Sequence, residues 1–145
     1  MTGPCSASNQ ASSEPQEKRQ PERRAAWAAV RLANGNTLIS GNAVGYVREV
    51  NSRGETIWEI NKHDLPGIPL FTVQEVSRLA NGNTLINNWS GGLPPDEVQT
   101  AVQLVEVAPD KKVVWALKDW KTLGPSSSTQ LLDEPGVPED GGLQR

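Results

Sequence analysis

The sequence predicts an all-β fold, a β-propeller fragment of two four-stranded antiparallel blades plus the first strand of a further blade. Three observations predict it. A nine-residue phrase occurs twice without change, as Arg31–Ile39 and, 47 positions later, as Arg78–Ile86. Short apolar segments separated by turn residues surround both copies, and no segment between the turns has the apolar spacing of a helix of about 12 residues. A repeat of this length with four short strands is typical of propeller blades.

The first 24 residues contain no Leu, Ile, Val, Phe, Trp or Tyr. Such a segment cannot bury enough apolar surface to offset its ordering entropy, so we expect residues 1–26 to be disordered. Helix propensity competes with strand formation directly afterwards, because Pro21–Ala29 has the composition of a helix start. The repeat alignment favours a strand from Ala28.

The first blade is predicted over residues 27–62. Asn34-Gly35 joins its first two strands, since Asn and Gly tolerate the positive φ of a tight hairpin turn. Ser52-Arg53-Gly54 joins its last two strands. The four strands are expected at Ala28–Leu32, Thr37–Ser40, Tyr46–Val50 and Thr56–Ile60.

The second blade is predicted over residues 63–120. Asn81-Gly82 and Pro109-Asp110 supply its two hairpin turns. Its strands are expected at Val73–Leu79, Thr84–Trp89, Val102–Val107 and Val113–Lys118. Residues 121–145 are expected to be a partial strand, Ser126–Leu132, followed by a loop tail.

The second blade carries an insertion. Trp58 and Trp115 occupy equivalent positions 57 residues apart, whereas the repeated phrases are only 47 apart. The ten extra residues fall in Gly91–Thr100, which is loop by composition.

Two blades are fewer than a closed propeller needs. Closed propellers use about four to eight blades, and two blades leave the outer face of each sheet uncovered. We therefore expect the chain to be a piece of a larger propeller, or one that completes a ring by self-association.

Charge and composition exclude several classes of protein. The net charge is −3, and it falls on the chain after residue 24 without a basic stripe, which argues against a nucleic-acid partner. No apolar run is long enough to span a membrane, and the first 30 residues lack the apolar core of a secretory signal. Cys5 is the single cysteine, so neither an internal disulfide nor a cysteine-based zinc site is expected.

The repeated phrase, followed by Val47–Ile60, resembles the quinoprotein-like (PQQ-like) β-propeller repeats of bacterial secreted proteins. Residues 51–58 resemble a shortened tryptophan-docking motif, in which a turn Gly and a following Trp lock adjacent blades. The second copy keeps Trp115 but has Lys111 where the first has Gly54. The resemblance implies an extracellular or periplasmic protein. It allows dehydrogenases that use pyrroloquinoline quinone, arylsulfotransferase-like enzymes and assembly scaffolds.

Trp58 and Trp115 are interpreted as blade-docking residues, because their equivalent repeat positions favour packing between blades. Gly35 and Gly82 are interpreted as structural turn residues of the same scaffold.

A ligand site is expected on one face of the propeller. A meander places the connection between its second and third strands on the same face as the connection to the next blade. Function concentrates on such loops. That face gathers the candidate ligand residues His63, Asp64, Trp89, Asp96 and Glu97.

The chemistry of these candidates favours binding over catalysis. His63 is the sole histidine, and no nucleophile motif accompanies it, so a solvated loop histidine is the preferred interpretation. One His and scattered carboxylates lack the spacing of a metal site, and Asp96 with Glu97 supplies too few oxygens for calcium. Trp89 is the aromatic residue to which a ligand role is assigned. Asn88-Trp89-Ser90 matches a glycosylation sequon, which is discounted as a chance match.

The sequence therefore predicts a non-enzymatic propeller piece that needs no cofactor and binds a protein or small ligand on this loop face. The alternative is a fragment of a quinoprotein-like or arylsulfotransferase-like enzyme whose catalytic residues lie in other blades.

Overall fold

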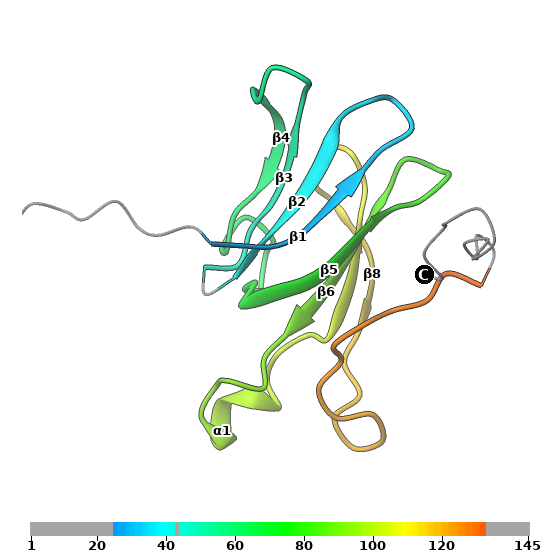
Figure 1. Cartoon of the computed structure of the whole chain (residues 1–145). Helices are drawn as coiled ribbons and strands as arrows, with labels where there is room; N and C mark the ends of the chain where they lie inside the picture. The colour runs from blue at the N-terminus through cyan, green and yellow to red at the C-terminus, as the bar shows by residue number, and fades with distance from the viewer. Residues whose placement is uncertain (1–24, 43, 133–145) are drawn as a thin grey trace, which may run out of the picture.

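The computed structural model describes residues 25–42 and 44–132, and it consists of two four-stranded antiparallel sheets (Figure 1). Within the described residues neither sheet closes on itself or shares strands with the other. The first sheet runs in the order β1 (Ala25–Arg31), β2 (Thr37–Asn42), β3 (Val47–Val50) and β4 (Thr56–Ile60). The second repeats this order with β5 (Thr72–Arg78), β6 (Thr84–Trp89), β7 (Leu104–Val107) and β8 (Val113–Leu117).

All eight strands lie where the sequence predicts strands, with differences at their ends. β1 begins at Ala25, which corrects the disorder boundary at residue 26 and extends the strand that was predicted to start at Ala28. Ala25 and Ala26 pair with Asn42 and Gly41 of β2, so the hydrogen-bond ladder overrides alanine's helix propensity. The remainder of the predicted disordered segment and of the predicted loop tail lies outside the described residues.

Two other expectations are corrected. The insertion Gly91–Thr100 is not loop throughout, because it contains the single helical turn α1 (Pro95–Val98), which Pro95 opens with a pre-set φ. The predicted strand Ser126–Leu132 has no strand hydrogen bonds. It runs along the second sheet, where Ser126 and Thr129 contact the side chains of Asn87 and Glu75.

The hairpin turns follow the predicted chemistry. Gly35 and Gly82 adopt φ of 85° and 86°, where glycine carries no steric penalty. In the first turn of each sheet an asparagine side-chain oxygen also accepts a backbone N–H two residues on. Asn34 accepts from Asn36, and Asn81 accepts from Asn83, both at 2.9 Å. In the β7–β8 turn Lys111 has φ of 69°, the conformation that Gly54 adopts in the β3–β4 turn.

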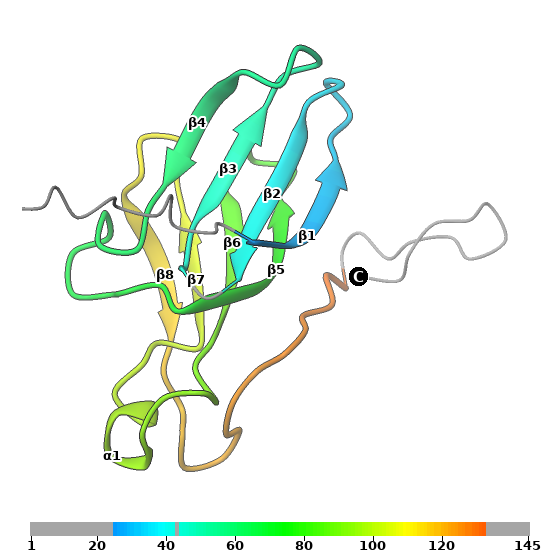
Figure 2. The same cartoon turned by 60° about the vertical axis from the view of Figure 1, so that its left-hand side comes forward.

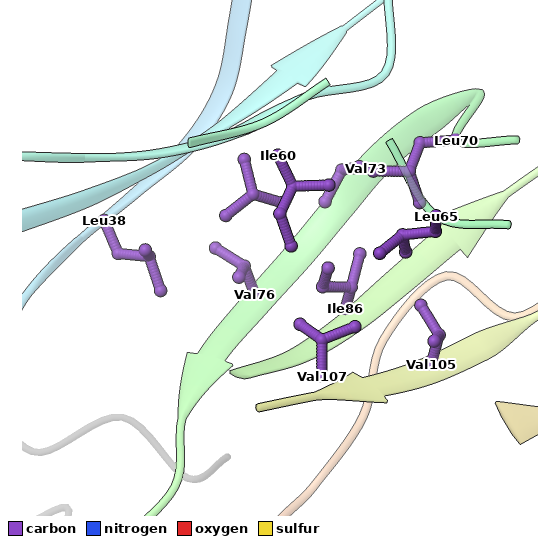
Figure 3. Close-up of a cluster of buried hydrophobic side chains, with 10 residues drawn as sticks. Leu38, Ile60, Leu65, Leu70, Val73, Val76, Ile86, Val105 and Val107 are labelled. Atoms are coloured by element: carbon purple, nitrogen blue, oxygen red, sulfur yellow. The ribbon is translucent and has the colours of Figure 1, made fainter. Parts of the chain in front are cut away.

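The second sheet packs face to face on the first, with β5 lying on β1 and β2 (Figure 2). Figure 3 shows Leu38 and Ile60 of the first sheet directed toward Val73, Val76 and Ile86 of the second. Fully burying a side chain of this size stabilises the fold by about 1.5 to 3 kcal/mol. The rest of this core is formed by Val47, Leu65, Leu70, Val105 and Val107.

One polar cluster crosses between the sheets, and we call Arg78, Glu49 and Trp58 the arginine joint. Arg78 Nη2 of the second sheet lies 2.7 Å from Glu49 Oε2 of the first. Its guanidinium lies 5.3 Å from the centroid of the Trp58 ring. The Trp58 indole N–H in turn donates to the carbonyl of Pro109, at 2.9 Å, in the second sheet.

Two asparagines of the repeated phrase position the Glu49 carboxylate for its contact with Arg78. Asn36 and Asn34 donate to its Oε1 at 2.8 and 3.3 Å. Burial alone raises the pKa of Glu49, but these hydrogen bonds and the charge of Arg78 outweigh it, so the pKa lies below its ordinary value. The carboxylate, only 5% exposed, therefore remains charged at neutral pH.

Candidate functional site

The connections β4–β5 (residues 61–71) and β6–β7 (residues 90–103) lie at one end of the sheets, opposite the hairpin turns (Figures 1 and 2). The β6–β7 connection carries α1 at its outermost point. We call this end the loop face. It is the part of the described chain where irregular backbone from both halves of the sequence meets.

Asn88 at the end of β6 fastens the two connections together. Its side-chain amide donates to the carbonyls of Pro69 at 3.1 Å and Val102 at 3.0 Å, and its Oδ1 accepts the backbone N–H of Phe71 at 2.7 Å. Because Asn88 is only 1% exposed and both ends of its amide are used, it has a structural role. It is buried in this fold, which supports discounting the sequon that begins with it.

A cavity of about 210 Å³ opens between the two connections. It offers one ammonium group, two aromatic rings and two hydroxyl groups. Its lining consists of Lys62, Phe71, Thr72, Trp89, Ser90, Gly92 and Leu93.

The lining is held in place by close packing. Trp89 lies over the two glycines that follow it, and a Cβ on Gly91 would stand 2.8 Å from the Trp89 ring, so that position requires glycine. Lys62 Nζ lies 5.5 Å from the centroid of the Phe71 ring, which keeps the ammonium at the cavity. Ser90 is buried, and its hydroxyl has no hydrogen-bond partner among the described residues.

Of the predicted ligand residues, Trp89 alone lines this cavity. His63 and Asp64 are exposed on the β4–β5 connection. Asp64 Oδ2 accepts the backbone N–H of Asn61 at 2.9 Å, which gives it the role of a turn former. Asp96 and Glu97 are exposed in the first turn of α1.

Sequence reasoning missed Lys62, Phe71 and Ser90. The signal available for Lys62 was its position beside His63 in a connection already singled out. Ser90 carried no signal, because a serine after a strand is ordinary turn composition.

Among the residues predicted to dock blades, Trp58 lies in the arginine joint, whereas Trp115 on β8 is 47% exposed. Gly35 and Gly82 lie in hairpin turns at the opposite end from the loop face.

The described residues contain no group of three or more His, Cys, Asp and Glu side chains that could hold a metal ion. No helix in this part of the chain has the length and apolarity needed to cross a bilayer. The cavity on the loop face offers hydrogen-bonding groups, one positive charge and aromatic surface. The cavity lining contains no carboxylate or imidazole to act as a general base.

Comparison with known families and with curated proteins finds no match. Among solved structures, the chain is similar to a protein of unknown function from Bacteroides caccae, at 29% sequence identity and a TM-score of 0.60. The similarity covers 68% of this chain but 36% of that one, so the chain spans about a third of that protein.

Proposed function

We propose that the chain is part of a quinoprotein-like β-propeller and serves as a non-enzymatic binding scaffold whose loop face takes a small ligand or a partner side chain. Two stacked four-stranded meanders joined by a tryptophan and an arginine support the propeller assignment. The match covers only 36% of the chain of the similar solved structure, which supports a larger assembly. The cavity beside Trp89 carries the binding proposal.

The chemistry of the cavity selects a class of ligand. The Lys62 ammonium favours a carboxylate or another anion, and Phe71 and Trp89 favour a flat apolar body. Thr72, which also lines the cavity, supplies a hydroxyl group for a hydrogen bond. A cavity of about 210 Å³ is smaller than the ~300 Å³ at which drug-sized sites begin, so the ligand is fragment-sized.

Titration with benzoate and with its neutral analogue benzamide tests this proposal. We expect benzoate to shift the amide resonances of Lys62, Phe71 and Ser90 and to bind more tightly than benzamide. Lys62→Gln should weaken benzoate binding about tenfold, the value of one charge-assisted hydrogen bond. Lys121→Gln, a change of an exposed lysine outside the cavity, is the matched control. Equal binding of both probes, or no shift at the cavity, would contradict the proposal.

A further inference from the structure

The face of the second sheet that points away from the first carries the repeat counterparts of residues that the first sheet buries between the two sheets. In the first sheet Leu38, Val47 and Ile60 are fully buried in the core between the sheets. The counterparts of these three residues and of Glu49 are half-buried, and Trp115, the counterpart of Trp58, is 47% exposed. These counterparts are Leu85, Leu104, Glu106, Trp115 and Leu117.

On this face an asparagine holds the Glu106 carboxylate in the same way as the Glu49 carboxylate is held. Asn83 Nδ2 donates to Glu106 Oε1 at 2.6 Å, as Asn36 does to Glu49. In the first sheet the second carboxylate oxygen receives Arg78. Within the described residues no arginine reaches Glu106.

The matching arginine is in the first sheet, on the face that does not carry Leu38. Arg31 in β1 occupies the position of Arg78 in the repeated phrase, and it pairs with Thr37 across the hairpin as Arg78 pairs with Thr84. Its side chain is exposed, and its guanidinium donates to the carbonyl of Gly35 at the tip of its own hairpin, at 2.7 Å. The face of the first sheet that carries Arg31 is therefore the counterpart of the face that the second sheet buries inside the chain.

We propose that a second copy of this chain docks head to tail on the second sheet, with its Arg31 placed on Trp115 and Glu106 as Arg78 is placed on Trp58 and Glu49. Repeat equivalence also gives the Trp115 indole an acceptor. Trp58 donates to Pro109, and the residue at that position of the first sheet is Ser52, whose carbonyl would receive the Trp115 N–H.

A second copy fits because one chain holds both complementary surfaces. The internal contact shows that this surface chemistry holds two sheets together, and the repeated phrase supplies its arginine and its two asparagines unchanged. A head-to-tail contact closes a ring when the rotation permits. Two, three or four copies would give four, six or eight sheets, the range that closed propellers use.

The C-terminal segment must leave part of this face when a copy docks. Thr129 Oγ1 donates to Glu75 at 3.1 Å, and Ser126 lies on Asn87 at 3.3 Å. These two contacts place the segment on β5 and β6, which correspond to β1 and β2, the strands that β5 covers in the first sheet. An incoming β1 would need the same place. Glu75→Ala, which releases Thr129, should therefore strengthen association.

Light scattering of the full chain, with charge-reversal variants, tests the proposal. We expect a discrete species of two to four 15.7 kDa chains. Arg31→Glu alone and Glu106→Arg alone should each weaken association about 100-fold, because like charges then meet in the joint. An equimolar mixture of the two variants should associate again, since each pair retains one native Arg31–Glu106 contact.

Matched controls separate this contact from a general charge effect. Lys121→Glu and Glu97→Arg make the same charge changes at exposed positions outside both faces and should leave the mass unchanged. Circular dichroism confirms that each variant is folded. If Arg31→Glu fails to fold, Trp115→Ser, a change of a half-exposed side chain, takes its place and should also dissociate the oligomer. A monomeric wild type at high micromolar concentration, or an oligomer that all three joint variants leave intact, would overturn the proposal.

Discussion

Lys111 and Gly54 occupy the same turn position with the same left-handed backbone, yet only glycine adopts it without strain. The Lys111 side chain is exposed, so replacing it removes little packing. We expect Lys111→Gly to stabilise the chain by about 0.5 to 1 kcal/mol after the entropy of glycine is counted. Gly54→Lys is the matched reverse change and should cost a similar amount, because no atom crowds that position. Urea unfolding of both variants measures this, and a loss of stability in Lys111→Gly would refute it.

Glu49 gives the chain a pH-dependent contribution to stability. Its pKa is lowered in the folded state, so the charged form stabilises the fold above the unfolded-state pKa of about 4.3, and this contribution is lost as pH falls through the folded-state pKa. We expect Glu49→Gln to lower the free energy of unfolding by about 2 kcal/mol at pH 7 and by less below about pH 4. The cost is moderate because the Arg78 side chain retains some exposure to solvent.

The equivalent change in the second sheet is the control for that measurement. Glu106→Gln removes a carboxylate that Asn83 holds, but no arginine of the described chain contacts it. At concentrations at which the chain is monomeric, Glu106→Gln should lower the free energy of unfolding less than Glu49→Gln does. A cost independent of pH for Glu49→Gln would show that charge has no part in the joint.

The loop face depends on one side chain, that of Asn88, which joins its two connections. Asn88→Ala removes three hydrogen bonds and leaves the backbone groups of Pro69, Phe71 and Val102 without their partner. We expect Asn88→Ala to lower the free energy of unfolding by about 3 kcal/mol, because a buried polar group without a partner destabilises the fold by more than its hydrogen bond stabilises it. Hydrogen exchange should quicken in both connections.

The neighbouring Asn87→Ala is the matched control for Asn88→Ala. Asn87 is equally buried, but its Nδ2 has no partner among the described residues and its Oδ1 meets only Ser126. Asn87→Ala should therefore lower the free energy of unfolding clearly less than Asn88→Ala does. Equal costs for the two variants would mean that burial, and not the fastening of the connections, explains the effect.

The repeat predicted the two four-stranded antiparallel sheets of the molecule well, because its turns are chemically explicit. The Asn-Gly pairs at Asn34 and Asn81 require hairpins, and the eight strands follow at their expected places. The first strand began earlier than predicted, since alanine carries little strand propensity and the ladder with β2 decides its length.

The site was less accessible to sequence reasoning than the fold. The loop face was predicted from meander geometry, but its cavity depends on Lys62, Phe71 and Ser90, which approach one another only after Asn88 fastens the connections. The ion pair between Arg78 and Glu49 joins residues in different sheets and leaves no local signal in either segment. Contacts of this kind are set by packing and not by nearby sequence.

Each copy of the nine-residue phrase carries an arginine and an asparagine that holds the glutamate of its own sheet, and the arginine of the second copy reaches back to the glutamate of the first sheet. A unit that begins with this phrase is compatible with itself on either side. Duplication of the gene segment therefore needs no new interface at each step, and an array could lengthen by tandem copying alone. The same property makes the unit a building block for designed arrays, in which the number of copies sets the size of the product.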